Sequence, residues 1–469
     1  MITPATAMAE TAASDTGAAA ATAAYDALLR GGLARATYEA LLEQQRARGL
    51  VYDGRPVCEV LRPRLLDASA YAELQRGAEL VMRGLSAVVD ATRSDARLRE
   101  ALGLGPLAAA LTRIDGDAPR PDVVGQLDGL VDEEGRARFI EYNPSPAGIA
   151  LCDEVAEMFG AMPATQALLE SWPAEAPSLR RALRDALDRA GDRAGAAGPP
   201  RIGVVGRSTK NAAEVAKLLG YLAEGGAPVA PPAEAAAWSM DGGVLRCGGH
   251  PVDLVVFLHP DHAAALLQRD GEDHPILRAV RVGAARVLNG LYRSEVLYSK
   301  ALFAALSDPA LAVRFEPEVA EAIARHVPWT RIVRPEMTTS GGREVDLPNL
   351  VVEHQDALVL KPARGFGGEG VLLGWQCDAE AWRAALDAAL RGPAVVVVQE
   401  RVWMRAEPFP VLREGELAFE ERFADLNPFV WGGDVATGCS VRVCREPLLN
   451  VGRGGSIVPA FVLGGERRG

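Results

Sequence analysis

Residues 123–143 read VVGQLDGLVDEEGRARFIEYN, two apolar-rich runs on either side of the turn-forming DEEG. This pattern predicts a β-hairpin with its turn at the DEEG segment. Successive side chains of a strand point to opposite faces, so Glu141 and Asn143 share one face. A carboxylate and an amide side by side, followed directly by the PSPAG turn of residues 144–148, indicate a functional site.

Asp128, on the first run, joins this face in only one kind of hairpin register. A loop with an even number of residues, centred on the two glutamates of DEEG, would place Asp128 opposite Phe139 and on the face of Glu141 and Asn143. A loop of odd length would turn Asp128 to the other face. Mg²⁺ prefers carboxylate and amide oxygens, so the first register predicts a magnesium site. The alternative is an ordinary solvated hairpin face.

The composition narrows the classes of protein. The chain has 469 residues, enough for two or three packed units. Its 62 Asp and Glu against 50 Lys and Arg give a net charge of −12, which disfavours nucleic acid as a partner. No run of about 18 uncharged apolar residues occurs, so no membrane span is expected. The six cysteines form no CxxC pair, which favours reduced thiols in a cytoplasmic protein.

The chain divides by pattern into successive regions. Residues 1–24, rich in Ala and Thr, are expected to form a disordered tail. Apolar residues at helical spacing predict a helical region over 25–111, and residues 112–195 hold the hairpin and a further helical stretch. After the linker-like GDRAGAAGPP, residues 200–288 predict a βαβ unit from RIGVVG, a helix and VDLVVFLHP. Its GVVG segment lacks the GxGxxG pattern of dinucleotide-binding folds.

Two lysines and two glycine-rich segments stand out in residues 289–398 and 399–469. The segment YRSEVLYSKALFAALSD is expected to be a helix that presents Lys300 near its start. KPARGFGGEGVLLGW predicts a strand, a glycine-rich loop and a strand, where backbone N–H groups and Lys361 can hold phosphates. AVVVVQERV predicts a buried strand with a polar end, and a second glycine-rich loop follows SVRVC.

Taken in order, these segments resemble the circularly permuted ATP-grasp ligases, in particular glutathionylspermidine synthetase and, more remotely, the eukaryotic type of glutathione synthetase. LDGLVDEEGRARFIEYNPSPAGI is similar to the magnesium-binding block of the family, and SKALFAALSD to the helix opened by an ATP-contacting lysine. KPARGFGGEGVLLG is similar to the lid hairpin, and VVQERV to the strand that holds adenine. The resemblance, over residues 113–463, implies an α/β (α+β) fold: a circularly permuted ATP-grasp core with a βαβ substrate-side domain and a helical N-terminal region.

The resemblance also implies roles for single residues, with ATP and Mg²⁺ as cofactors. Mg²⁺ would be held by Asp128, Glu141 and Asn143. The nucleotide would be contacted by Lys300, Lys361, Gly367, Gly368, Gln399, Glu400, Arg401 and Val402. The substrate acid would meet loop donors at Ser145 and Gly148.

One position departs from the family pattern. Relatives commonly have an arginine two residues before the metal-binding aspartate, where it steadies the reacting carboxylate, and Gln126 occupies that place here. An amide donates hydrogen bonds but brings no charge, so Gln126 is expected to contact substrate without replacing the arginine. Arg113 and Arg442 are the candidate catalytic cations, each against the alternative of an ordinary surface arginine. Glu369 lies in the lid hairpin, where some relatives have an acidic metal ligand, but its spacing from Lys361 is longer than in those relatives.

The activity implied is an ATP-dependent carboxylate–amine ligase. ATP would phosphorylate a small amino acid or peptide acid, and an amine would attack the acyl phosphate to give an amide. A kinase that stops after phosphoryl transfer, or a nucleotide-binding protein without catalysis, is the alternative. The expected partners are the small acid and amine, with no nucleic acid and no membrane. The sequence does not identify the acid or the amine, and it leaves a homo-oligomer open.

Overall fold

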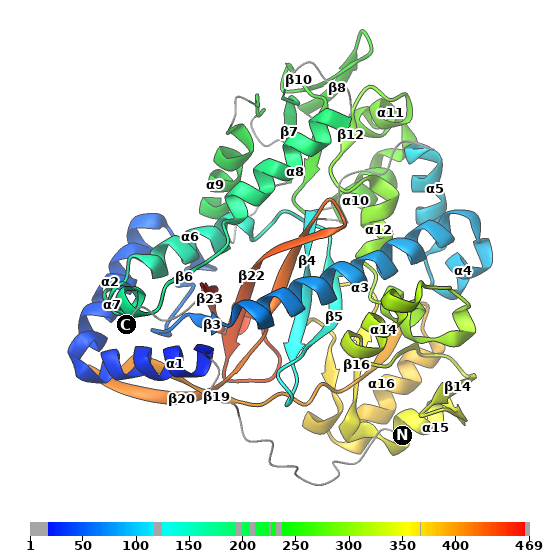
Figure 1. The fold of residues 1–469 in the computed structure, drawn as a ribbon. Coiled ribbons are helices and arrows are strands. Elements are labelled where there is room, and N and C mark those ends of the chain that lie inside the picture. Colours follow the sequence, from blue (N-terminus) through cyan, green and yellow to red (C-terminus); the bar gives the residue numbers. More distant parts are fainter. Residues whose placement is uncertain are drawn as a thin grey trace.

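The centre of the molecule is a large, mostly antiparallel sheet (Figure 1). The computed structural model describes residues 17–116, 124–193, 199–206, 212–224, 227–230, 237–259, 261–365 and 367–464. Among them the nine strands of this sheet follow the order β19-β20-β22-β21-β4-β5, with β23 beside β22 and with β3 and β6 beside β23. Their bounds are β3 Arg64–Leu66, β4 Val124–Val131, β5 Ala137–Asn143, β6 Ala174–Glu175, β19 Glu407–Arg413, β20 Glu416–Ala424, β21 Asn427–Trp431, β22 Val435–Cys444 and β23 Ser456–Leu463.

Helices cover both faces of this central sheet. The long helix α3 crosses one face (Figure 1) and packs against β21, β22 and β23. Val430 of β21 belongs to the α3 side, whereas its neighbours Phe429 and Trp431 pack with Leu183 and Leu187 of α8. Alternate residues of one strand thus meet different helices, as the pleat requires. The helices concerned are α3 Ala68–Ser94, α6 Ile149–Gly160, α7 Pro163–Ser171 and α8 Leu179–Arg193.

The N-terminal region is held to the sheet by helices and short strands. Its helices are α1 Gly17–Leu28, α2 Ala34–Arg48, α4 Ala96–Ala101 and α5 Gly105–Asp115, with a π-helical turn over Leu29–Leu33. Residues 17–24, expected in a disordered tail, instead belong to α1, because Ala21 and Tyr25 are fully buried and anchor the helix. The tail prediction is therefore wrong for this part, and residues 1–16 lie outside the described residues.

The predicted βαβ unit is confirmed. Strands β7 (Ile202–Val205) and β11 (Leu254–Phe257) pair in parallel, β12 (Arg286–Val287) continues the sheet, and α9 (Ala212–Ala223) lies between β7 and β11 in the chain. The sequence did not indicate the small antiparallel sheet that precedes β11. Its strands, and the helices that follow, are β8 Trp238–Asp241, β9 Val244–Cys247, β10 His250–Pro251, α10 Asp261–Asp270 and α11 Pro275–Arg281.

A third sheet carries the glycine-rich loop. Its antiparallel order is β13-β18-β16-β17, so the predicted strand, loop and strand around Lys361 are confirmed. Buried Trp382 and Leu386 of α16 pack beneath β16 and β18 with Leu350 of α15. The bounds are β13 Thr330–Ile332, β16 Leu358–Pro362, β17 Leu372–Leu373, β18 Val396–Glu400, α15 Leu347–Glu353 and α16 Ala379–Arg391, with β14 Met337–Ser340 and β15 Arg343–Asp346 forming a hairpin and α14 Pro317–His326 preceding β13.

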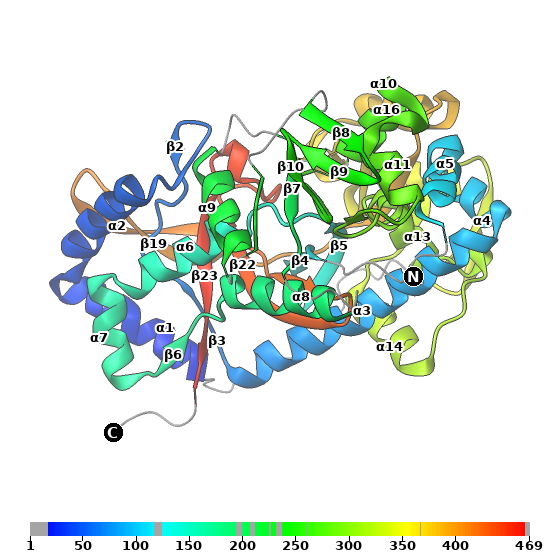
Figure 2. The same ribbon diagram turned by 90° about the horizontal axis from the view of Figure 1, so that it is seen from above.

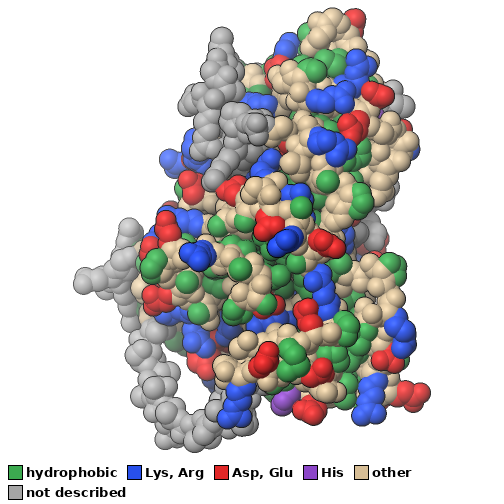
Figure 3. Space-filling view, turned by 90° about the vertical axis from the view of Figure 1, so that its right-hand side faces the viewer, with side chains coloured by type: hydrophobic (Ala, Val, Ile, Leu, Met, Phe, Trp, Pro, Cys, Tyr) green, Lys and Arg blue, Asp and Glu red, His purple; other side chains and the backbone are tan. Residues whose placement is uncertain are grey.

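These three sheets converge around the hairpin of β4 and β5. Seen from above, the parallel sheet and the sheet of β16 lie toward one end of the central sheet, and the N-terminal helices α1 and α2 toward the other (Figure 2). The space-filling view in Figure 3 shows acidic and basic side chains interspersed over one face. No helix within the described ranges is both long and apolar enough to cross a membrane.

Candidate active site

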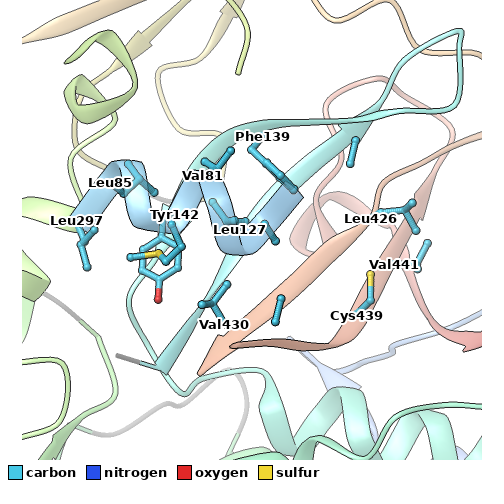
Figure 4. Packing of buried hydrophobic residues seen from close by; sticks show 14 of the residues in the cluster. Val81, Leu85, Leu127, Phe139, Tyr142, Leu297, Leu426, Val430, Cys439 and Val441 are labelled. Atoms are coloured by element: carbon cyan, nitrogen blue, oxygen red, sulfur yellow. The ribbon is translucent and has the colours of Figure 1, made fainter. Parts of the chain in front are cut away.

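The β4–β5 hairpin presents two chemically different faces. Leu127, Phe139 and Tyr142 are buried and point toward α3 (Figure 4). Asp128 and Glu141 lie opposite each other and point the other way, because adjacent strand residues alternate. The apolar face fixes the hairpin in the core, and the polar face becomes the wall of a cavity.

A β-bulge sets the register of this hairpin. Residues 132–136 separate the two strands, which is an odd number, and Gly129 pairs with Phe139. The register then shifts, so that Ile140 is skipped and Asp128 pairs with Glu141. The expected pairing of Asp128 with Phe139 is therefore wrong. The bulge nevertheless returns Asp128 to the face of Glu141, which an unbroken odd-length hairpin would not do.

Three oxygen-bearing side chains meet on this face. The amide Nδ2 of Asn143 donates to Oδ1 of Asp128 at 3.2 Å, and Glu141 faces Asp128 across the ladder. Gly129 allows the close approach of the neighbouring strand, because a Cβ there would lie 2.5 Å from the carbonyl oxygen of Leu426. The convergence predicted from the sequence is thus present in the structure.

Three cations surround the two carboxylates. Lys300 Nζ lies 3.1 Å from Glu141 Oε2 and donates to the carbonyl of Gly365 at 2.8 Å. Arg442, on β22, donates to Asp128 Oδ2 at 2.8 Å. Lys361, at the end of β16, is buried in the same cavity. These cations come from three segments far apart in the chain, so the fold assembles the cluster.

Lys300 reaches the cavity through a break in a helix. The single helix expected over residues 292–308 is instead two helices, α12 Leu291–Leu297 and α13 Ala301–Ser307, so that expectation is wrong. Lys300 precedes α13, and its backbone N–H donates to the carbonyl of Ala363 at 2.8 Å. The break therefore fastens the backbone of Lys300 to the glycine-rich loop while its side chain turns to Glu141.

Burial and charge shift the pKa values of these groups in opposite directions. Burial, together with the charges of Glu141 and Asp425, raises the pKa of Asp128 in spite of Arg442. Burial also opposes ionisation of Glu141, but Lys300 and Lys361 outweigh it and hold the Glu141 pKa well below its ordinary value. Burial lowers the pKa of Lys361 to about 8. The cavity thus holds an ionised Glu141 beside a lysine whose positive charge is opposed by burial.

One cavity connects this cluster to an apolar end. Near the cluster, Gly367 and Gly368 have φ values of 70° and 73°, which residues with a Cβ rarely adopt. The cavity is lined at the charged end by Asp128, Glu141, Lys300, Lys361, Arg364, Gly367, Gly368, Glu369 and Arg442, and at the apolar end by Leu130, Val359, Leu373, Trp375, Gln399, Glu400, Val402 and Met404. A long ligand with an anionic end and a flat apolar end fits this arrangement.

Arg401 does not line the cavity as Gln399, Glu400 and Val402 do. Its guanidinium lies 3.9 Å from the ring centroid of Trp375 and 3.7 Å from that of Trp403. Arg401 follows the end of β18, and its side chain stacks between the two indoles, of which Trp375 lines the cavity. A direct contact of Arg401 with the nucleotide therefore stays a prediction.

Arg113 also lies outside the cavity, in contrast to Arg442. It is on the solvent side of α5 with a side chain 64% exposed, and it pairs with Glu272 Oε1 at 2.9 Å. The interpretation of Arg113 as a catalytic cation is wrong, because α5 turns its apolar side to the core and leaves Arg113 in water. Arg442 lines the cavity and contacts Asp425 Oδ2 at 2.5 Å.

Gln126 is engaged inside the protein. Its Nε2 donates to Ser440 Oγ at 2.7 Å and to the carbonyl of Asn427 at 3.2 Å. Gln126 lies opposite Asn143 in the hairpin, but it is not among the residues that line the cavity. The expected contact of Gln126 with a substrate has no support in this geometry.

The PSPAG turn is pinned to the βαβ unit at two points. Ser145 Oγ donates to the carbonyl of Leu258 at 2.8 Å, just after β11. The Gly148 N–H donates to Glu214 Oε1 at 2.8 Å, at the start of α9. Burial raises the pKa of Glu214 to about 7, although the hydrogen bond from Gly148 lowers it. The predicted substrate loop thus joins the carboxylate face to the end of the parallel sheet.

Sequence reasoning missed two buried acids near the site. Asp425 is fully buried and fixes Arg442, and Glu214 is 5% exposed and holds Gly148. An acid flanked by apolar residues, as in FADLNPFVW, was the available signal for Asp425. Within the described segments, no group of three or more Asp, Glu, His or Cys forms a metal cluster.

Comparison with known proteins identifies the fold. No protein-family model and no curated protein matches the chain. Among solved structures, the apo form of a glutathione synthetase-like effector from Globodera pallida is similar, with a TM-score of 0.60 and 13% identity over 91% of this chain and 96% of that chain. D-alanyl-alanine synthetase A from Vibrio cholerae matches with a TM-score of 0.27 and 13% identity over 55% of this chain and 86% of that chain. The chain therefore has a mixed α/β fold similar to that of the glutathione synthetase-like effector.

Proposed function

We propose that the protein is an ATP-dependent ligase that joins a small carboxylic acid to an amine. The observation that carries this proposal is the meeting of Asp128 and Glu141 with Lys300, Lys361 and Arg442 in one cavity. The glycine-rich loop and an apolar end complete that cavity. The fold similarity to a glutathione synthetase-like effector supports the same class of chemistry.

Asp128, Glu141 and Asn143 would hold Mg²⁺. The two carboxylates fit, because they line the cavity with hard oxygen atoms, and Lys300 and Arg442 contact them as stand-in cations. Asn143 does not line the cavity itself, and it would join them from beside Asp128, which it contacts. Magnesium in phosphoryl-transfer sites is commonly shared between one or two carboxylates and the nucleotide phosphates, so a third carboxylate is not required. When bound, the ion would neutralise charge on those phosphates.

The protein's own groups supply binding and charge. Lys300, Lys361 and the backbone N–H groups of Gly367 and Gly368 would hold the phosphates of ATP, and the apolar end would take the nucleobase. A carboxylate oxygen of the acid attacks the terminal phosphorus, and ADP leaves. The amine nitrogen then attacks the carbonyl carbon of the acyl phosphate, phosphate leaves, and the nitrogen loses a proton to water.

Arg442 is the candidate for the catalytic cation at the reacting carboxylate. Its guanidinium is fixed by Asp425 and Asp128, and it lines the cavity that Gln126 does not reach. A preorganised cation lowers the barrier because it faces the oxygen on which charge develops. The donors of Ser145 and Gly148 are taken by Leu258 and Glu214, and neither residue lines the cavity. The PSPAG turn would therefore help to place the acid through its position at the end of the parallel sheet, where ligands of open α/β sheets commonly bind.

The test is ADP release from the purified protein with a panel of amino acids, peptide acids and amines. A ligase forms ADP only with both an acid and an amine, and mass spectrometry then detects the amide. A stable phosphorylated product that forms without amine would replace the ligase with a kinase. Tight binding of ATP with no turnover on any acid would leave a nucleotide-binding protein.

A further inference from the structure

Two glycine-rich segments face each other at the cavity. The loop after β16 contains Gly368, and a Cβ there would come within 3.2 Å of Leu448 in the loop after β22. A Cβ on Gly367 would lie 3.6 Å from Nδ2 of Asn450. Residues 447–450 also line the cavity. The inner side of the C-terminal loop, residues 445–455, is therefore a wall of the candidate nucleotide site.

The outer side of this C-terminal loop is covered by an N-terminal hairpin. Strands β1 (Val51–Tyr52) and β2 (Arg55–Pro56) pair around Asp53 and Gly54, whose φ values of 51° and 75° suit a tight two-residue turn. A guanidinium nitrogen of Arg55 donates to the carbonyls of Val451 at 3.2 Å and Gly452 at 3.1 Å. The hairpin thus contacts residues 451–452 of the loop, which follow the cavity-lining residues 447–450 and do not line the cavity themselves.

The ends of the loop have their own anchors. At its start Arg445 contacts Glu420 Oε2 at 3.1 Å, and at its end Ser456 Oγ accepts from the N–H of Glu59 at 3.0 Å. Between these points the chain contains Gly452, Gly454 and Gly455, which restrict the backbone little. Arg55 therefore contacts the loop at the 3-10 turn of Val451–Arg453, beside these glycines.

We propose that Arg55 is a positioning residue for the nucleotide, through the C-terminal loop. This inference rests on the proposed function. The planar guanidinium reaches two adjacent carbonyls from one nitrogen and holds the outer side of the loop. The inner side, at residues 447–450, then stays against Gly367 and Gly368 before ATP arrives. Without that contact, binding of ATP must order the loop, which weakens the apparent affinity.

The test compares Arg55→Ala with Arg35→Ala. Arg35 is a matched control, because it is an exposed arginine on the nearby helix α2 and pairs only within that helix, with Glu39 at 3.0 Å. In the absence of ATP, hydrogen exchange of amides 451–455 should be about three- to tenfold faster in Arg55→Ala. The KM for ATP should rise by a similar factor while kcat changes less than about twofold.

Arg55→Lys separates the guanidinium geometry from charge alone. A lysine keeps the charge but loses the planar fork, so its exchange and KM should lie between those of wild type and Arg55→Ala. Because Arg55 is exposed, all three variants should unfold at the wild-type temperature. If Arg55→Ala matches Arg35→Ala in exchange and in KM while the wild type turns over ATP, only this inference is overturned. A wild type that binds no ATP overturns the proposed function as well.

Discussion

The two faces of the β4–β5 hairpin are both covered by other parts of the protein, fully on the apolar face and partly on the polar one, where Asp128 is buried and Glu141 half-buried. On one face Leu127, Phe139 and Tyr142 pack against α3. On the other, Asp128 and Glu141 are balanced by cations from distant segments. The same two strands therefore contribute stability through one set of residues and candidate chemistry through the alternate set. Substitutions on each face should affect mainly one of these two properties.

The largest effect is expected on the apolar face, from Phe139→Ala. Phe139 is fully buried and its ring centroid lies 5.7 Å from that of His326. Removing the ring leaves a cavity, so the free energy of unfolding should fall by about 3 to 5 kcal/mol. The molecules that remain folded should turn over substrate within about twofold of wild type. Urea denaturation and the kcat per folded molecule measure the two properties.

Failure of that separation would be informative. A Phe139→Ala variant that keeps its stability but loses turnover would indicate that the reacting groups lie on the apolar face, which contradicts the assignment of the two faces.

On the polar face, Glu141→Gln should reduce kcat/KM by at least about a hundredfold, which is about 2.7 kcal/mol. The amide keeps the shape of Glu141 but removes the charge that pairs with Lys300. Stability should also fall, because the ionised Glu141 balances Lys300 and Lys361, but by less than in Phe139→Ala, because Asp128 ionises more readily once the repulsion of Glu141 is gone. ADP release and thermal unfolding test this directly.

Tyr142→Phe is the matched control on the adjacent residue, which points to the apolar face. It should keep full turnover. Equal activity of Glu141→Gln and wild type would remove Glu141 from the candidate metal site.

The sequence could predict the polar cluster because its signals are local. Alternation along two short strands put Glu141 and Asn143 on one face, and a lysine before glycines marked Lys361. The bulge at Ile140 was not predictable, because it depends on how β4 pairs with β21 as well as with β5. Loop length can be predicted from sequence only approximately, and a change of one residue in that length moves Asp128 to the other face of the hairpin.

The residues that sequence reasoning misplaced depend on tertiary packing. Arg113 and Arg442 are similar in sequence, each an arginine among apolar residues. Only the position of α5 at the surface and of β22 beside β21 separates them. The break between α12 and α13 is likewise a tertiary effect, because the N–H of Lys300 bonds to Ala363, 63 residues later (363 − 300). Such partners leave no periodic signal in the sequence.

Glu214 lies outside the hairpin, accepts a hydrogen bond from the PSPAG turn beside the candidate site, and also affects the stability of the fold. Burial raises its folded pKa from 4.5 to about 7, so the folded state binds a proton that the unfolded state has lost between these pH values. Its contribution to stability is therefore full below pH 4.5 and falls as pH rises through 7. Glu214→Gln cannot ionise and should exceed wild type in stability by about 3 kcal/mol at pH 8.

Urea denaturation at pH 4.5 and at pH 8 measures this difference. The two proteins should be equally stable at the lower pH, because Gln accepts the hydrogen bond of Gly148 as the neutral acid does. Parallel pH profiles would show that Glu214 is ionised in the folded protein.

The smallest effect is expected from Arg113→Ala, which tests the boundary of the site. Arg113 is exposed and its ion-pair partner Glu272 is also partly exposed, so the pair contributes less than about 0.5 kcal/mol. Turnover should stay within about twofold of wild type, because the guanidinium does not reach the cavity. Arg442→Lys, measured in the same assay, should lose at least about tenfold, since a lysine cannot bridge Asp128 and Asp425 as a guanidinium does. If Arg113→Ala lost as much as Arg442→Lys, the reacting carboxylate would lie near α5, and the polar face of the hairpin would not be its wall.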